Sequence, residues 1–239
     1  MTHNTHTQDR VVSSCVRNGT HFADCCGETE WVRSLIDRHH DACKATGAVI
    51  VSMCGFDSVP FDLGALFAVN ALRKRSNAPC RRVTARVTSL GSISGGSLAT
   101  GQIKAAAAKR LADYGVDAGS PFLLGGVRRG GVRAEDRDDY THNVSSYGSG
   151  GVVFEGPGTM ATINTRVVRR SAAALGYGTS LSLSLSLSLS LFLSLSLSLS
   201  LSLAPFLGPD FAYVERNLFG SEKRARKALR QVSLDSGCH

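Results

Sequence analysis

Along the first third of the chain, segments with the hydrophobic spacing of a helix alternate with segments that have the pattern of a strand. Apolar residues recur at helical spacing over 10–17 and 29–46, and the first of these helices is predicted to begin after Asp9. Between and after them, 20–24 and 48–53 have the length and composition of strands. The second strand is almost continuously apolar, which predicts that both of its faces are buried.

A third helix is predicted to follow the segment GFDSVP at 55–60. Asp57 or Ser58 can cap this helix, and Pro60 fits its first turn. Helices and strands that alternate with short links indicate an α/β fold around a parallel sheet. Because a parallel sheet of two strands cannot bury both faces, we interpret the segment as the later part of a doubly wound domain whose opening strands are absent.

Beyond residue 80 the pattern changes to a second, mixed α/β region. Strands are predicted over 82–90 and 151–155, and helices over 102–114 and 164–175. The intervening stretch 125–151 is rich in Gly, Arg and Asp and is predicted to be mostly irregular.

Serine and leucine alternate from Ser180 to Leu203, and only Phe192 breaks the pattern. A strand would place every leucine on one face, whereas a helix would spread them evenly and have no amphipathic face. The hydroxyl groups offset the gain from inserting the leucines into a membrane. A repeated TC dinucleotide encodes Ser-Leu in every forward frame, so we interpret the tract as a translated microsatellite.

The composition and charge of the chain limit the classes of function that the protein could have. Apolar residues make up 43% of the 239 residues, enough for a core, and the formal net charge is +8. The basic cluster over 223–230 has no interleaved aromatic residues, which favours a solvated helix end over a nucleic-acid site. The first 25 residues have no apolar stretch of the kind that a secretory signal needs, which predicts an intracellular protein.

The seven cysteines are an odd number and have no CxxC spacing, which argues against a disulfide scaffold and against a zinc ribbon. Cys25 and Cys26 adjoin, and His39, His40 and Cys43 share a helical spacing. Two or three ligands without a fourth are too few for a structural metal, so no metal site is predicted.

Three glycine-containing segments are candidates for ligand binding. Gly156, Gly158 and Ala161 form a dinucleotide-type fingerprint, but Pro157 removes a backbone donor from it, which favours an ordinary turn. The segment 55–60 is more informative, because it lies where a strand ends and a helix begins. Ligands of open α/β folds bind at that edge. A further polar loop consists of Ser94, Gly95, Gly96 and Ser97.

Several segments, taken in order, resemble the saccharopine dehydrogenase-like oxidoreductase family. That family includes trans-acting enoyl reductases of glycolipid assembly and lipid-droplet-associated relatives. The matching stretches are VRNGTHFADCCGE (16–28), CGFDSVPFDLG (54–64), SGGS (94–97), SPFLL (120–124), INTRVVRRSAAALGYG (163–178) and PDFAYVE (209–215).

The resemblance implies a division of the chain into parts. These are a partial Rossmann-like NAD(P)-binding domain over 1–77 and a second α/β domain over 78–178 together with 209–230. The Ser-Leu insertion occupies 179–208, and 231–239 is expected to be a disordered tail.

The resemblance also implies NADP or NAD as cofactor and a small-molecule or lipid-linked substrate. The candidate cofactor-lining residues are His21, Asp24, Glu28, Gly55, Phe56, Asp57 and Ser58, and the candidate substrate residues are Ser94, Gly95, Gly96 and Ser97. No catalytic residue is assigned.

The sequence departs from the family pattern in one respect that bears on function. Family members open with a strand and a Gly-rich loop that holds the cofactor's pyrophosphate, whereas the first glycine here is Gly19. We therefore expect no dinucleotide-dependent activity and no bound cofactor for this chain alone. The alternative is a non-enzymatic binding protein associated with a membrane or with lipid droplets; otherwise a cytoplasmic location is expected.

Overall fold

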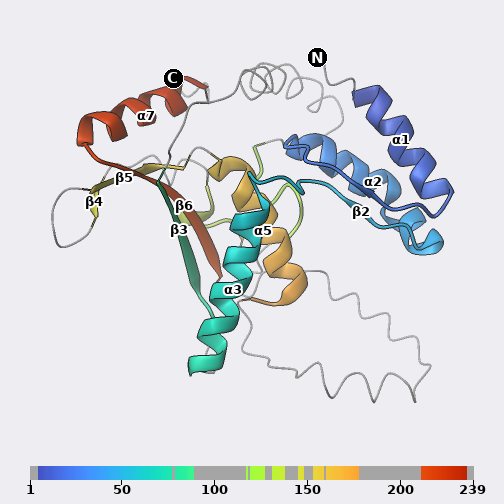
Figure 1. The fold of residues 1–239 in the computed structure, drawn as a ribbon, viewed down its shortest axis with the longest axis horizontal. Helices are drawn as coiled ribbons and strands as arrows, with labels where there is room; N and C mark the ends of the chain where they lie inside the picture. The colour runs from blue at the N-terminus through green and yellow to red at the C-terminus, as the bar shows by residue number, and fades with distance from the viewer. Residues whose placement is uncertain are drawn as a thin grey trace.

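The computed structural model describes residues 5–76, 79–88, 117, 119–126, 131–137, 145–147, 153–158, 160–177 and 211–235. The described part has the predicted α/β class, with helices packed against parallel and mixed sheets (Figure 1). The predicted helix over 102–114, the loop over 94–97 and the Ser-Leu tract lie outside the described residues. Within the described residues, no helix is both long enough and apolar enough to cross a membrane.

The first part alternates helix and strand as predicted. Its elements are α1 (Thr5–Arg17), β1 (Phe22–Ala23), α2 (Thr29–Thr46), β2 (Ile50–Val51) and α3 (Val59–Ser76). β1 and β2 are parallel neighbours, with Phe22 opposite Ile50. Gly19 and Gly47, which follow α1 and α2, both have the left-handed backbone that ends a helix.

Two expectations for this part were wrong. α1 begins at Thr5, so Asp9 lies inside the helix and does not cap it. Its carboxylate instead accepts a hydrogen bond from Arg38 of α2 at 2.7 Å. The second strand is also not buried on both faces, because Val49 and Val51 are 53% and 44% exposed. Among the described residues, side chains cover one face of this two-stranded sheet and leave Val51 on the other face exposed.

The second part contains a four-stranded sheet in the order β3-β6-β5-β4. Its elements are β3 (Arg82–Thr88), the 3-10 turn η1 (Ala134–Asp136), β4 (Ser145–Tyr147), β5 (Val153–Pro157), α5 (Ala161–Leu175), β6 (Ala212–Phe219) and α7 (Glu222–Asp235). β3 and β6 are parallel although they are far apart in the sequence, and the pairs β5–β6 and β4–β5 are antiparallel. α3 and α5 pack together and contact β3 and β6 respectively (Figure 1).

The dinucleotide-type fingerprint has a structural explanation. β5 runs antiparallel to β6, so the unit is not the parallel crossover that binds dinucleotides. A Cβ at Gly156 would lie 2.9 Å from the Phe219 ring, and one at Gly158 would lie 2.9 Å from Glu215. Both glycines therefore allow β5 and its exit to approach β6 closely.

Two clusters of buried side chains form the core. The first combines α3, α5 and β6 with Phe122, and the second combines α1 and α2 with Met53, Leu124 and Ile163. Both clusters contain residues from either side of residue 77. The domain division at that position stays a prediction.

A row of arginines on α5 holds the segment 119–126. Arg166 donates to the Gly119 carbonyl at 3.3 Å, Arg169 to the Pro121 carbonyl at 2.8 Å and Arg170 to the Leu124 carbonyl at 2.6 Å. At the end of the segment, a Cβ on Gly126 would lie 2.7 Å from the Arg169 carbonyl oxygen, and its φ is +83°. Only glycine fits there without a backbone shift.

Arg169 is the most enclosed member of this row, and its side chain is only 2% exposed. Its guanidinium lies 4.0 Å from the fully buried carboxylate of Asp136 and 5.3 Å from the centre of the Phe122 ring. Asp136 also accepts a hydrogen bond from the Arg133 backbone at 2.9 Å. Burial makes the two charges depend on each other, since neither can be solvated by water.

Replacing Arg169 with methionine is expected to lower the free energy of unfolding by about 3–5 kcal/mol, because the buried Asp136 carboxylate would lose the counter-charge that Arg169 provides. Urea unfolding followed by circular dichroism measures the change. The double variant R169M/D136N should recover a large part of the loss. Arg226→Met on α7, which removes an exposed pair with Glu222, should cost less than about 0.5 kcal/mol. Equal losses of stability for R169M and R226M would contradict the conclusion that the buried Arg169 guanidinium stabilises the fold through Asp136.

Candidate functional site

The site begins at the carboxyl ends of β1 and β2, which lie side by side. The Asp24 N–H donates to the Val51 carbonyl at 3.1 Å, and the Cys54 N–H donates to the Asp24 carbonyl at 2.8 Å. Between these bonds Met53 has a φ of 63°, a left-handed conformation that is uncommon for a residue with a side chain. Such strain is typical of functional edges. Each strand leads through a short loop into the N-terminus of a helix, α2 or α3.

The loop after β1 is closed by side-chain hydrogen bonds. Asp24 Oδ1 accepts the Cys26 N–H at 2.9 Å, and the Cys26 thiol donates to Glu28 Oε2 at 2.7 Å. Burial raises the pKa of the Asp24 carboxyl, although the backbone N–H of Cys26 opposes the change. Burial, together with the Glu28 carboxylate, raises the pKa of the Cys26 thiol far above its usual range. Cys26 therefore remains a protonated thiol and is not a nucleophile.

The loop after β2 packs tightly against the loop after β1. A Cβ on Gly55 would lie 3.0 Å from the Cys25 Cβ, so glycine lets the two loops touch. Ser58 is buried, and its carbonyl accepts the N–H groups of Phe61 and Asp62 in the first turn of α3. Phe56, in contrast, is 86% exposed at the rim.

The structure brings most of the predicted cofactor-lining residues together on these two loops. The residues at this edge are Asp24, Glu28, Gly55, Phe56, Asp57 and Ser58. His21 lies at the opposite, amino end of β1, where its Nδ1 accepts the Val49 N–H at 3.1 Å. The predicted substrate residues Ser94, Gly95, Gly96 and Ser97 lie outside the described residues. The role of each residue stays a prediction.

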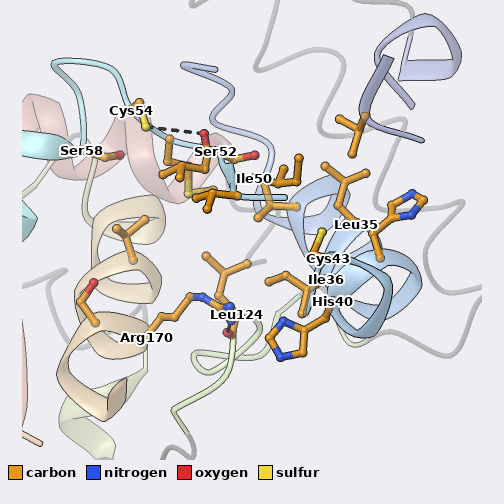
Figure 2. A pocket seen from close by; sticks show the side chains of 18 of the residues that line it. Leu35, Ile36, His40, Cys43, Ile50, Ser52, Cys54, Ser58, Leu124 and Arg170 are labelled. Carbon is orange, nitrogen blue, oxygen red and sulfur yellow. Dashed lines mark hydrogen bonds between the residues drawn. The ribbon is translucent and has the colours of Figure 1, made fainter. Parts of the chain in front are cut away.

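A groove of about 600 Å³ runs along β2 from this edge (Figure 2). α2 forms one wall, and α3 and α5 form the other. Most of its lining is apolar, including Leu35 and Ile36 of α2, Val51, Leu63, Leu124 and Val167. The volume falls in the range of small-molecule sites. Of the predicted site residues, Ser58 lines both the edge and the groove.

Polar side chains from distant parts of the sequence meet on the α3–α5 wall of the groove. The Ser171 hydroxyl donates to Asp62 Oδ2 at 2.8 Å, while Asp62 Oδ1 is buried without a hydrogen-bond partner. Burial raises the pKa of Asp62, and the hydrogen bond from Ser171 partly offsets this. Sequence reasoning missed this pair, because an aspartate in the first turn of a helix is ordinarily explained by the helix dipole.

Behind the groove, a buried carboxylate joins β6 to the start of α5. Glu215 is 1% exposed, and its Oε2 accepts the side-chain amide of Asn164 at 2.9 Å. Burial raises the pKa of Glu215 to about 7, although hydrogen bonds from Asn164 and from the Met160 backbone oppose the rise. The Tyr213 hydroxyl nearby is buried without a partner, and burial raises its pKa as well. Among the described residues, no group of three or more His, Cys, Asp or Glu side chains could hold a metal ion.

Named relatives are similar to much of this chain. A trans-acting enoyl reductase of Mycobacterium bovis is 34% identical over 179 residues, which are 68% of this chain and 40% of that protein. A trans-acting enoyl reductase of Mycobacterium leprae is 53% identical over 53 residues (22% of this chain, 13% of that protein). A saccharopine dehydrogenase-like oxidoreductase of Mus musculus is 37% identical over 62 residues (26% of this chain, 14% of that protein).

The chain belongs to the saccharopine dehydrogenase-like oxidoreductase family.

The family resemblance drawn from the sequence motifs is thereby confirmed. The match covers about 40% of the length of the Mycobacterium bovis relative, so the chain spans less than half of that protein. No family model matches it, and no solved structure matches it significantly. Two of the family-like motifs meet in the fold through the hydrogen bond between Asn164 and Glu215.

The buried Glu215 predicts a pH-dependent stability. Because its pKa is raised from 4.5 to about 7, its protonated form stabilises the fold, and this stabilisation is lost as the pH rises towards and through 7. The wild-type protein is expected to lose on the order of 2 kcal/mol of its free energy of unfolding between pH 5 and pH 8. Glu215→Gln mimics the protonated carboxyl, so this variant should not show that loss. Urea unfolding at both pH values measures it. The exposed-carboxylate control Glu222→Gln should keep the wild-type pH dependence; an unchanged pH dependence in E215Q would refute the role of Glu215.

Proposed function

We propose that this chain is the nicotinamide-facing and substrate-binding part of an NAD(P)-dependent oxidoreductase whose substrate is linked to lipid or glycolipid. The proposal rests on one observation: a polar edge and an apolar groove adjoin each other. The loops at the carboxyl edge of β1 and β2 hold polar groups and two helix N-termini, and an apolar groove of about 600 Å³ leads away from them.

The carboxyl edge fits the nicotinamide end of a dinucleotide. Asp24 Oδ2 is buried without a hydrogen-bond partner and could accept an amide N–H. The absence of a side chain at Gly55 lets the loops pack closely, and the first-turn N–H groups of α2 and α3 favour anionic or carbonyl oxygens. When bound, the nicotinamide would supply or accept a hydride. The residues of this edge would orient it and exclude water from it.

Within the part of the chain that the structure describes, we assign no comparable site to the phosphate end of the cofactor. No glycine-rich loop precedes the edge in the printed sequence, whose first glycine is Gly19. The glycines of the fingerprint at 156 and 158 are occupied by packing against β6 and α7. We therefore propose that these 239 residues alone do not hold the dinucleotide.

The groove supports a substrate with a hydrocarbon part. Apolar side chains along α2, β2 and α5 would bury such a chain, at roughly 0.8 kcal/mol for each methylene. Ser58 and Asp62 would face its polar end. The groove would equally serve a non-enzymatic lipid-binding protein, the alternative that needs no cofactor, and association with a lipid surface is part of either proposal.

A fatty acid that carries an environment-sensitive fluorophore should bind the groove of the full chain. Leu63→Asp places a charge on the groove wall and should weaken binding by about tenfold or more, since a carboxylate must be desolvated by the bound chain. Leu175→Asp is the matched control: Leu63 and Leu175 are 57% and 55% exposed, but Leu175 does not line the groove. Fluorescence titration measures both. Equal weakening in both variants would refute the groove as the site.

Isothermal titration of the full chain with NADPH is expected to show no binding in the micromolar range, because no Gly-rich loop precedes β1 in this sequence to hold the pyrophosphate. Micromolar binding would overturn the proposal that these residues alone lack a dinucleotide site. When NADPH is added to the fluorescent-probe complex, no oxidation of NADPH by this chain alone is expected. Oxidation of NADPH in the presence of an unsaturated acyl substrate would exclude a purely binding role.

A further inference from the structure

Three cysteines gather at the carboxyl edge, and they differ in exposure. Cys25 and Cys26 follow β1, and Cys54 follows β2. Cys25 and Cys54 are exposed free thiols, whereas Cys26 is half-buried. Exposure and a free thiol are the first requirements for oxidation by a soluble disulfide.

The backbone of the edge brings Cys54 next to Cys25. The left-handed Met53 turns the chain so that the N–H of Cys54 reaches the Asp24 carbonyl at 2.8 Å. That carbonyl belongs to the peptide that links Asp24 to Cys25. The Cys54 backbone is therefore hydrogen-bonded directly across the edge to the peptide before Cys25.

The side chain of Cys25 also faces the second loop. A Cβ on Gly55 would lie only 3.0 Å from the Cys25 Cβ, 3.8 Å from the Cys25 Cα and 3.9 Å from the Cys25 carbonyl oxygen. Gly55 directly follows Cys54. Cys25 is thus packed against the chain segment that carries Cys54.

Cys26, the neighbour of Cys25, is engaged elsewhere. Its thiol donates to Glu28 Oε2 at 2.7 Å, and its sulfur accepts the Glu28 N–H at 3.4 Å. Burial and the Glu28 carboxylate raise its pKa and keep it protonated. The Cys54 sulfur makes only a long contact, at 3.5 Å, with the Val51 carbonyl on the groove side (Figure 2). Of the three thiols, Cys25 and Cys54 are the pair that is free to react.

We propose that Cys25 and Cys54 form an oxidation site that a low-molecular-weight disulfide such as glutathione disulfide converts into an intramolecular disulfide bond. One cysteine thiolate attacks the oxidant, forms a mixed disulfide and expels one glutathione thiolate. The second cysteine thiolate attacks the protein sulfur of the mixed disulfide, forms the Cys25–Cys54 bond and expels the second glutathione. The two cysteines lose two electrons, and the two glutathione thiolates that leave take up the two cysteine protons.

The disulfide would link the loop before α2 to the loop before α3. These are the loops to which the proposed function assigns the nicotinamide, so the regulatory meaning of the bond rests on that proposal. Oxidation would fix the edge in one geometry and place two sulfur atoms at its rim. Reduction would release it.

The full chain is incubated with glutathione disulfide, the remaining thiols are alkylated, and tryptic peptides are analysed by mass spectrometry. The expected product joins peptide 18–33, alkylated on Cys26, to peptide 45–73, with a mass lower by two hydrogen atoms than the sum of these two peptides. Proximity in the fold should favour this pairing by about tenfold or more over other pairings. Cys26→Ser, the matched control, should form the same link between the two peptides. Cys25→Ser should instead carry a glutathione adduct on Cys54, and Cys54→Ser should carry one on Cys25.

Separate glutathione adducts on Cys25 and Cys54 in the wild-type chain, or a bond between Cys25 and Cys26, would overturn the proposal. So would an equal yield of the linked peptides in concentrated urea, since the pairing would then not depend on the fold. Because this experiment contains neither a dinucleotide nor a lipid, its failure is distinct from failure of the proposed function. That function is judged by the fluorescent-probe and NADPH titrations.

Discussion

The guanidinium of Arg169 carries a charge inside the protein, and the packing of α5 follows from where that charge is neutralised. Its partners are the buried carboxylate of Asp136, the Pro121 carbonyl and the face of the Phe122 ring. Together with Arg166 and Arg170 it fixes the segment 119–126 along one side of the helix. Phe122 of that segment belongs to one core cluster and Leu124 to the other, so this segment joins the two halves of the core.

The groove depends on the same arrangement. Leu124 and Arg170 both line it, and the hydrogen bond from Arg170 to the Leu124 carbonyl holds Leu124 against α5. α5 also contributes Ser171 to the polar pair with Asp62, and α3 is tied to the end of α5 by Arg73, which donates to the Tyr177 carbonyl at 3.1 Å. The shape and the polarity of the groove therefore depend on how α5 is anchored, and no single lining residue determines them.

The carboxyl edge has a different origin. Its geometry comes from the left-handed Met53 and from Gly55, which together let two loops share hydrogen bonds and close contact. The same closeness puts the exposed thiols of Cys25 and Cys54 on adjoining loops beside the Asp24 carboxylate. The proposed site for a cofactor amide and the proposed oxidation site therefore both depend on one backbone distortion.

Local sequence determined the helices and the candidate edge of this protein. Helical spacing over 29–46 and the terminating Gly47 predicted α2, because these signals act within a few residues. The strand-loop-helix order around Gly55 indicated the carboxyl edge for the same reason, and most of the predicted lining residues do lie there. Tertiary structure alone decided the pairing of β3 with β6, the exposure of Val51, the position of His21 and the meeting of Asp62 with Ser171. Those features join residues far apart in the chain or depend on what covers a face, and hydrophobic periodicity carries no information about either.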